Sequence, residues 1–415
     1  MKIWVINQYA VPTSLPGITR HFELIDEWVN SQSLDVIIWL SSFNYSLRRY
    51  LSKDERTQID RNHPEITIKW CWAFPHKKNN WKRVVNMLSF SIIFSLKALF
   101  KKKPDVIIAS SPQIFVTYVA LLIAKLFKVP FVLEVRDLWP ESLIAMNKRK
   151  QGSMAKFLFN IEASLYNNAE HIIVLTQYQK DYISKKGISS NKIDLIPNGV
   201  VVEKQIEITK ETIDEVRRKI GVSKEAYVAI YTGAHGNANA LESVVRAAKF
   251  LGKDEYIVLI GDGPDKPNLL KIKEKDDLQQ VIFLEPVPKT EIIKYTAAAD
   301  CGIISLENND VFKGARPNKL FDYMSLGKPV LSTIGGEIGF ILSTNKVGWV
   351  VPDNVAPDVG LARLIQSTRR MPALEKEKIR ENGEVYIKNE GNRRKSASKF
   401  LSIINGIKSD IKTQN

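Results

Sequence analysis

Short apolar runs alternate with longer amphipathic segments along most of this chain of 415 residues. Each run is continuous and rich in Val, Leu and Ile, which is typical of a strand buried on both faces of a sheet. In the first half the predicted strands are residues 2–6, 36–40, 66–70, 106–109, 131–134, 171–175 and 192–196. The longest segments between them predict helices over residues 19–30, 84–100, 114–127 and 156–168. This alternation predicts a parallel sheet with helices on both faces.

A second series of the same kind follows the sequence Pro197-Asn198-Gly199 and a charge-rich helix predicted over residues 211–220. Its predicted strands are residues 227–231, 256–260, 281–284, 301–305, 329–333 and 348–351. We therefore predict an α/β protein of two doubly wound, Rossmann-like domains, residues 1–198 and 199–389, with a linker at 199–210. The last helix, about residues 390–415, is expected to pack back on the first domain. Because open α/β sheets bind ligands at the carboxyl ends of their strands, the domains are expected to face a central cleft.

The net charge of +15 is concentrated in the first half of the chain, where residues 1–200 hold 27 Lys and Arg against 16 Asp and Glu. A basic half indicates an anionic partner, such as nucleic acid, an acidic membrane surface or a phosphorylated substrate. No nucleic-acid-binding motif accompanies the charge, so nucleic acid is not expected. Cys71 and Cys301 each adjoin an apolar run and are expected to be buried thiols in a reducing compartment. With no signal peptide and no apolar stretch of bilayer length in sight, we expect a cytoplasmic protein.

The segment 312–330, FKGARPNKLFDYMSLGKPV, predicts a loop, a short helix and a turn into a buried strand. Gly314 and Pro317 prevent a helix before Asn318, which is predicted as the N-cap. The Gly-Lys-Pro sequence that follows the apolar helical positions ends the helix.

Two cations, Arg316 and Lys319, flank this predicted helix start, where free backbone N–H groups already favour an anion. Asp322 follows one turn later, where a carboxylate can accept hydrogen bonds from the neighbouring hydroxyls of a ribose. A phosphate site beside an acceptor for hydroxyls is what a nucleotide diphosphate requires. The alternative is an ordinary solvated helix start with surface charges.

Two further loops with candidate chemistry follow strands of the first half. Gly17, after the first strand, allows a ligand to approach the backbone closely, and Arg20 lies in the first turn of the next helix. Arg136 and Asp137 follow the strand at 131–134, within the sequence VRDLWPE. A charged pair beside an aromatic residue at a strand end indicates a site, and an ion pair that merely holds the loop is the alternative.

The loop at residues 232–240, TGAHGNANA, follows the first strand of the second half. Its glycines, Gly233 and Gly236, are predicted to open a helix and resemble an anion-binding nest. His235 is either a donor to phosphate or a plain loop residue. No Asp-x-Asp pattern and no metal-ligand spacing are present. We therefore expect neither a metal nor another cofactor, and we expect cations and helix starts to meet the charge of a diphosphate.

In order and spacing these motifs resemble the retaining GT-B glycosyltransferases of glycosyltransferase family 4. The likeness is greatest to the bacterial enzymes that build O-antigen, capsule or exopolysaccharide, including the fucosamine-transferase type. The resemblance covers nearly the whole chain and rests on Pro16-Gly17-x-x-Arg20, Arg136-Asp137-Leu138-Trp139-Pro140-Glu141, Ile196-Pro197-Asn198-Gly199-Val200, Gly261-Asp262-Gly263-Pro264 and Pro317-x-Lys319-x-Phe321-Asp322-Tyr323-Met324-x-x-Gly327-Lys328-Pro329.

The resemblance implies roles for individual positions. The acidic residue at Asp322 binds the donor ribose, the turn at Gly17 approaches the diphosphate, and the strand end at Val287 faces the base. The family commonly carries two glutamates eight positions apart in this motif, whereas here Gly314 stands at the first position. The carboxylate missing at Gly314 would contact the donor sugar, so the sugar itself stays open.

A second departure concerns the diphosphate. The Arg and Lys pair that the family places after the first strand of its second domain is missing from residues 232–240. We expect Arg316 and Lys319 to take over that role. Asp137 is the candidate for orienting the acceptor or the donor sugar, with Arg136 beside it.

The resemblance implies a metal-independent hexosyltransferase that moves a hexosyl or acetamido-hexosyl group from a nucleotide diphosphate sugar, with UDP as the first expectation. The acceptor is expected to be a polyprenyl-diphosphate-linked sugar, and the anomeric configuration is expected to be retained. Two alternatives stay open. A nucleotide-sugar epimerase on the same scaffold would consume donor without an acceptor, and a two-lobed solute-binding protein would not turn it over.

Basic clusters at Arg48-Arg49 and at residues 76–83, 101–103 and 148–150 lie in the first half, together with the amphipathic-looking segment 84–100. They predict docking on an anionic membrane leaflet, so we expect a peripheral protein on the inner face of the bacterial cytoplasmic membrane. The alternative is a solubilising basic surface over an ordinary core helix.

Overall fold

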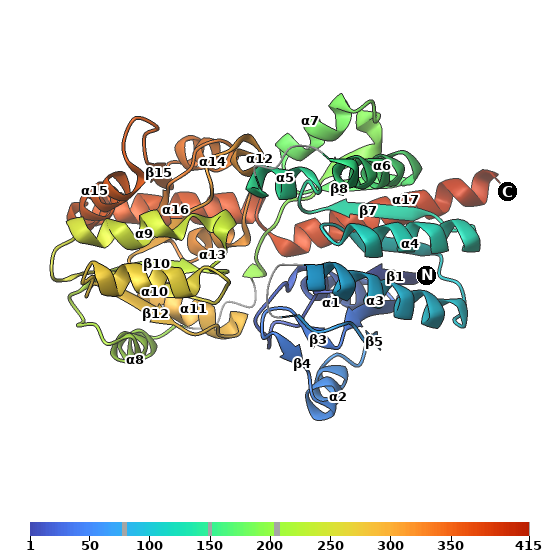
Figure 1. Cartoon of the computed structure of the whole chain (residues 1–415), viewed down its shortest axis with the longest axis horizontal. Helices are drawn as coiled ribbons and strands as arrows, with labels where there is room; N and C mark the ends of the chain where they lie inside the picture. The colour runs from blue at the N-terminus through green and yellow to red at the C-terminus, as the bar shows by residue number, and fades with distance from the viewer. Residues whose placement is uncertain (77–80, 148–151, 203–207, 415) are drawn as a thin grey trace. The chain divides into compact units, whose positions relative to one another are not determined.

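The computed structural model describes residues 1–76, 81–147, 152–202 and 208–414. They form two compact units, as Figure 1 shows. Unit 1 comprises Met1–Pro197 and Arg394–Asn415, and unit 2 comprises Asn198–Arg393. The predicted linker at 199–210 lies partly outside the described residues.

Within the described residues, unit 1 is built on a seven-stranded parallel sheet in the order β5-β2-β1-β6-β7-β8-β9. Its strands are β1 (Lys2–Ile6), β2 (Asp35–Ser41), β5 (Ile66–Cys71), β6 (Val106–Ser110), β7 (Phe131–Val135), β8 (His171–Val174) and β9 (Ile193–Leu195). Each predicted strand is present to within one residue at its ends. A small antiparallel pair, β3 (Phe43–Asn44) and β4 (Arg49–Tyr50), was not predicted, because strands of two residues leave no periodic signal.

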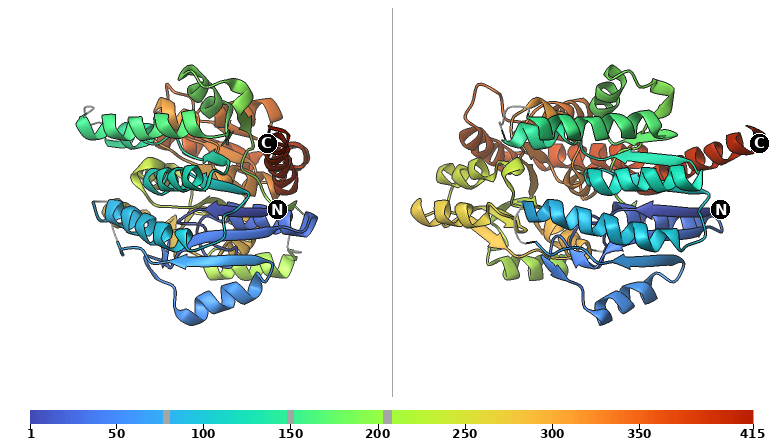
Figure 2. Two further views of the ribbon diagram at one scale, coloured as in Figure 1. Left: turned by 90° about the vertical axis from the view of Figure 1, so that its right-hand side faces the viewer. Right: turned by 45° about the vertical axis from the view of Figure 1, so that its right-hand side comes forward.

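Helices cover both faces of this sheet. The helices of unit 1 are α1 (Arg20–Ser31), α2 (Lys53–Asn62), α3 (Trp81–Leu99), α4 (Ile114–Phe127), α5 (Glu141–Asn147), α6 (Ser153–Asn168), α7 (Gln177–Lys185) and α17 (Arg393–Gln414). Figure 2 shows α3, α4 and α6 side by side on one face, and α17 covers the other face with α1. Successive strand residues alternate between the two resulting cores: Trp4 and Ile6 join the first core, and Val5 joins the second.

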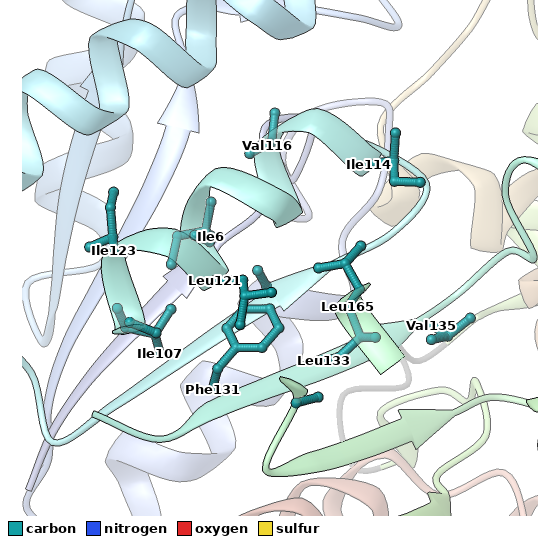
Figure 3. Close-up of a cluster of buried hydrophobic side chains, with 14 of the residues drawn as sticks. Ile6, Ile107, Ile114, Val116, Leu121, Ile123, Phe131, Leu133, Val135 and Leu165 are labelled. Carbon is teal, nitrogen blue, oxygen red and sulfur yellow. The ribbon is translucent and has the colours of Figure 1, made fainter. Parts of the chain in front are cut away.

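The core under α4 and α6 is the one drawn in Figure 3. Leu121 of α4 and Leu165 of α6 point onto Phe131 and Leu133 of β7, all of them buried. No helix among the described residues combines the length and the apolarity that crossing a bilayer requires.

Unit 2 repeats the plan on a six-stranded parallel sheet in the order β12-β11-β10-β13-β14-β15. Its strands are β10 (Tyr227–Thr232), β11 (Glu255–Ile260), β12 (Val281–Leu284), β13 (Cys301–Ile304), β14 (Val330–Ser332) and β15 (Gly348–Val350). Its helices are α8 (Lys210–Ile220), α9 (Leu241–Ala247), α10 (Lys266–Lys275), α11 (Lys289–Ala298), α12 (Asp310–Lys313), α13 (Asn318–Ser325), α14 (Glu337–Asn345), α15 (Pro357–Arg370) and α16 (Ala373–Asn389). One core lies under α8, α13, α14 and α16, and the other lies under α9, α10 and α15.

The C-terminal segment consists of two helices, α16 and α17, and the last helix predicted over about residues 390–415 corresponds to α17. Gly391 separates α16 from α17, and its carbonyl accepts a hydrogen bond from the backbone N–H of Val200 at 2.9 Å. A Cβ at Gly199 would come within 2.2 Å of that carbonyl, so the two chain segments can approach only because Gly199 has none. Beyond the break, Phe400 of α17 packs edge-on against Trp28 of α1, with ring centroids 5.2 Å apart.

Candidate functional site

Helix α13 lies against the switch point of the unit 2 sheet, where β10 has β11 on one side and β13 on the other. Tyr323 fixes the helix there. Its hydroxyl accepts a hydrogen bond from the backbone N–H of Thr232, at the end of β10, at 3.1 Å. Its ring lies over Gly302 of β13, where a Cβ would come within 2.2 Å of the ring. Ligands of open α/β sheets bind at such switch points, so the start of α13 is the candidate site.

The helix start differs from the prediction in one detail. Pro317 is the cap residue, with φ −70° and ψ 151°, and Asn318 is the first helical residue instead of the N-cap. Pro317 suits this place because its ring fixes φ near the value that the chain needs there. Within the described residues no side chain caps α13, and the buried Oδ1 of Asn318 has no hydrogen-bond partner. The backbone N–H groups of the first turn are therefore not taken by a capping side chain.

Lys319, in that first turn, reaches across to the end of β10. Its Nζ lies 3.6 Å from the ring centroid of Tyr231, a cation–π distance. It also lies 3.1 Å from the point where a Cβ of Gly233 would stand. Gly233 has φ +140°, which a residue with a side chain rarely adopts. Burial lowers the pKa of Lys319 to about 7, although the charge of Asp322 opposes the shift. A lysine perturbed in this way at a strand end is a typical mark of a functional site.

Asp322 lies on the same side of α13, one turn after Lys319, with its side chain 16% exposed. Its Oδ1 is 3.8 Å from Nζ of Lys289, the first residue of α11. The carboxylate therefore lies near two cations, Lys289 and Lys319.

Arg316 precedes the helix and is held from two sides. Its Nη2 pairs with Oε1 of Glu337 at the start of α14, and its carbonyl accepts from the side-chain amide of Asn198 at 3.1 Å. Its buried Nε has no partner in the described part of the chain. Gly314, two residues earlier, is buried at the end of α12 and carries no group that could replace a carboxylate.

His235 is fully buried between the loops that follow β10 and β11. A Cβ at Gly263 would come within 2.2 Å of the His235 carbonyl, and a Cβ at Gly261 would come within 3.3 Å of its Nε2. Burial lowers the pKa of His235 to about 4, and nearby Lys266 adds to the shift, so the imidazole is neutral at pH 7. Neither ring nitrogen has a partner among the described residues. A buried polar group of this kind usually has one, and a ligand would supply it.

The two glycines of this loop were predicted to open a helix. Instead a 3₁₀ turn, Asn237–Asn239, comes first, and α9 begins only at Leu241. Val287, predicted to face a base, follows β12 and is partly buried against the core of unit 2. Beside it, Glu285 pairs with Lys266 at 2.7 Å.

In unit 1 the predicted residues Arg136 and Asp137 follow β7 directly. The Oγ of Ser111 accepts a hydrogen bond from the backbone N–H of Arg136 at 3.0 Å and donates one to the carbonyl of Asp137 at 3.0 Å. The Nε and Nη1 of Arg136 are buried without a partner among the described residues. The side chain of Asp137 is exposed. No Arg136–Asp137 ion pair occurs there, so the loop is held by Ser111 instead.

Arg20 has a different environment from the one predicted. Its fully buried guanidinium donates to Oε1 of Glu134 at 2.8 Å and to the carbonyls of Pro197 at 2.7 Å and Ile196 at 3.0 Å. These bonds tie α1 to β7 and to the end of the first chain segment of unit 1. The geometry favours a structural role for Arg20 over contact with a donor.

Glu134 also binds the ring of His21, whose Nε2 lies 2.8 Å from its Oε2. Burial alone would raise the pKa of Glu134, but the charge of Arg20 and the hydrogen bond from His21 outweigh it and hold the pKa well below the usual range. Burial lowers the pKa of His21, so a neutral ring donates from Nε2 and accepts at Nδ1 from Asn7 at 3.2 Å. Gly17, in the preceding loop, has φ +146°, and a Cβ there would come within 2.8 Å of Val11.

The structure therefore brings His235, Arg316, Lys319 and Asp322 to one edge of unit 2. It places Arg136 and Asp137 at an edge of unit 1. Sequence reasoning missed Tyr231, Lys289 and Glu337, the partners of the predicted residues. A signal did exist for Glu134, because a single carboxylate inside an apolar strand must have a buried partner. Within the described residues no group of three or more His, Cys, Asp or Glu side chains gathers as a metal site requires.

Two family models match the chain. Residues 17–199 match the model of the glycosyl transferase 4-like domain, and residues 226–366 match that of glycosyl transferases group 1. WcaI of Escherichia coli (strain K12), named as a colanic acid biosynthesis glycosyl transferase, is 23% identical over 363 residues, which span 83% of this chain and 86% of that protein. WbjE of Pseudomonas aeruginosa, named as a glycosyltransferase, is 24% identical over 71% of this chain and 74% of its own length.

Solved structures share the fold across the whole chain. Anabaena Alr3699/HepE, solved in complex with UDP and glucose, has a TM-score of 0.75 and 15% identity, covering 98% of this chain and 100% of that one. WaaG, a glycosyltransferase involved in lipopolysaccharide biosynthesis, has a TM-score of 0.69 and 14% identity, covering 97% of this chain and 100% of its own. The predicted fold class, GT-B with two Rossmann-like parallel sheets, is confirmed. The two matched models together span more than three quarters of the chain, which therefore belongs to the glycosyltransferases that join a glycosyl transferase 4-like domain to a group 1 domain.

Proposed function

We propose that this protein transfers a hexosyl or acetamido-hexosyl group from a UDP-linked sugar to a sugar hydroxyl, with retention of the anomeric configuration. The observation that carries the proposal is the set of unsatisfied donors at the start of α13 and in the loop after β10. Lys319 has a desolvated ammonium, and the buried Nε of Arg316 and ring of His235 lack described partners. Donors arranged in this way would bind the two phosphates of a nucleotide sugar.

Similar proteins support the choice of donor and pathway. HepE has been solved with UDP and with UDP-glucose, and WcaI is named for colanic acid biosynthesis. In our proposal Asp322 accepts the ribose hydroxyls, and Val287 borders the base. The acceptor is a sugar linked to polyprenyl diphosphate, held by unit 1 with Asp137 and Arg136 orienting it. Contact of Gly17 with the diphosphate is part of the same proposal.

The proposed reaction needs no protein nucleophile. The bond from the anomeric carbon to the β-phosphate oxygen breaks, a bond to the acceptor oxygen forms on the same face, and the acceptor proton passes to the leaving phosphate. Catalysis then consists of positioning and of stabilising the charge that develops on the diphosphate. Arg316, Lys319 and the N–H groups of α13 supply this stabilisation, so we propose that activity persists in EDTA.

A panel of UDP-, GDP- and dTDP-sugars in a thermal-shift assay tests the donor, and NMR of the product tests retention. Incubation with donor alone must leave the sugar configuration unchanged, because inversion of a ring centre without an acceptor would indicate an epimerase. Arg316→Ala should lower kcat/KM at least tenfold, since losing one charge-stabilising contact typically costs about 10²–10³ in rate. Arg380→Ala is the matched control, because Arg380 lies exposed in ion pairs on α16. Equal activity of the two variants would contradict the role of Arg316.

A further inference from the structure

The outer side of α3 carries an apolar stripe that nothing in the described part of unit 1 covers. Ile92 is 60% exposed, Leu96 54% and Phe100, just beyond the helix end, 86%. The neighbouring α4 adds Leu122 and Leu126, which are 47% and 64% exposed. We call this set the outer apolar face; its members are Trp81, Val84, Leu88, Ile92, Leu96, Leu99, Phe100, Leu122 and Leu126. Exposed apolar side chains that form a continuous surface mark an interaction site more often than scattered ones do.

The stripe is not a face left over from core packing. The inner side of α3 is already occupied, because Phe90 and Phe94 are fully buried and Phe94 meets Trp39 edge-on with centroids 5.1 Å apart. From Val84 to Leu96 the outer members recur every four residues, which places them on one side of the helix. A helix of 19 residues extends the stripe over about 28 Å. Helix α3 is therefore apolar on two opposite sides, one for the core and one for a partner.

The chain around the stripe is strongly basic. The described residues between positions 66 and 104 include seven Lys and Arg and no Asp or Glu. Lys101, Lys102 and Lys103 follow α3 directly and are exposed. Lys125 and Lys128, at the end of α4, are also exposed. Both helices connect parallel strands of one sheet and pack together, so their C-terminal ends lie at the same end of the layer, as Figure 2 shows.

The chemistry of this face selects one occupant. We propose that this protein docks on a bilayer that contains anionic lipid, with the outer apolar face and the lysines at the ends of α3 and α4 against the membrane. Apolar side chains would enter the acyl boundary, while the lysines bind headgroups. A second copy docked symmetrically would bring like-charged lysines together, and nucleic acid would leave the apolar stripe uncovered. The basic clusters at residues 77–80 and 148–150 lie outside the described residues and carry none of this argument.

The test is flotation of the full chain with vesicles of phosphatidylcholine alone or of phosphatidylcholine mixed with anionic phosphatidylglycerol, whose negative surface attracts basic segments. Wild type should float with the anionic vesicles and release as salt rises. Ile92→Ser with Leu96→Ser should reduce the bound fraction about tenfold or more, because two apolar anchors are lost. The matched control, Leu374→Ser with Val385→Ser, removes two equally exposed apolar side chains of α16 and should float like wild type.

The charge is tested in the same way. Lys101→Gln, Lys102→Gln and Lys103→Gln together should lower binding to anionic vesicles, whereas Lys271→Gln, Lys378→Gln and Lys388→Gln, exposed in unit 2, should not. Equal binding of both lysine sets, equal binding to neutral vesicles, or a dimer that Ile92→Ser with Leu96→Ser dissolves would each overturn the proposal. The docking proposal depends on the proposed function only for its biological purpose, since a lipid-linked acceptor lies at a membrane. Transfer to a water-soluble acceptor is measured alongside, so loss of activity and loss of docking are told apart.

Discussion

The lowered pKa of Lys319 links donor binding to pH. Its ammonium lies over the Tyr231 ring and beside Gly233, and burial lowers its pKa to about 7. A bound diphosphate would stabilise the charged form of Lys319, which burial destabilises, and would raise its pKa towards the usual value of lysine. Binding of the donor should therefore take up a proton.

The sign of the pH dependence follows. Below pH 7 the free protein already carries the charge on Lys319, and above pH 7 that charged fraction falls. We predict that the affinity for a UDP-sugar weakens above pH 7, by up to about tenfold per pH unit. Calorimetry between pH 6 and 9, in buffers of different ionisation enthalpy, measures both the affinity and the proton. His235, with a pKa of about 4, does not titrate in this range. In Lys319→Ala the affinity should be weak and independent of pH, and an unchanged slope would refute the assignment.

Asp137 is the residue of unit 1 for which we predict a role in turnover. It is exposed at the end of β7, while the buried donors of Arg136 beside it lack described partners. Asp137→Asn keeps the shape but removes the charge. We expect kcat to fall at least tenfold while the thermal shift produced by the donor is preserved. Unchanged turnover would make Asp137 a purely structural residue.

At the scale of elements, the loops after β10 and β11 depend on backbone contacts that only glycine permits. A Cβ at Gly261 would come within 1.9 Å of the Gly233 carbonyl, at a φ of +149° that side chains disfavour. Gly261→Ala should therefore displace the loop that carries Gly233 and His235.

We predict a loss of about 2 kcal/mol or more in the free energy of unfolding, with weaker donor binding. Gly252→Ala is the control, because its new Cβ would meet only the end of the Glu255 side chain, at 3.5 Å. Denaturant unfolding of both variants measures the difference. An equal free energy of unfolding for the two variants would show that the loop can move without loss of stability.

The same scale shows what a sequence can predict here. The strands and the start of α13 were predictable because a buried strand and a proline before a helix are local signals. The pairs Lys289–Asp322 and Arg316–Glu337 were not, since they join elements that are far apart along the chain. The pairing of Arg20 with Glu134 was not predictable for the same reason, because the two residues are 114 positions apart along the chain.

At the scale of the whole molecule, each unit has its own sheet and its own cores. Phe400 belongs to unit 1 alone, where α17 covers the core with Trp28 and Leu401. Removing a buried Phe side chain costs about 3–5 kcal/mol.

We therefore predict that Phe400→Ala lowers the melting temperature of unit 1 and leaves that of unit 2 unchanged. A UDP-sugar should raise the melting temperature of unit 2, because a ligand stabilises the unit that binds it. Scanning calorimetry with and without the donor separates the two transitions. The control is Ile341→Ala, in a core of unit 2, which should lower the other transition instead. If the UDP-sugar instead raised the melting temperature of the transition that Phe400→Ala lowers, the nucleotide would bind unit 1 and the prediction would be wrong.

The ends of unit 2 meet each other. Val200 and Asn392 form a parallel bridge, and the backbone N–H of Arg393 donates to the carbonyl of Val200 at 2.9 Å. The chain therefore enters and leaves unit 2 at adjacent points, which these backbone hydrogen bonds join. Unit 2 could be exchanged as a whole between related enzymes with a single pair of splice points, before Asn198 and after Arg393. Chimaeras of this kind offer a direct way to ask which half of the chain chooses the sugar.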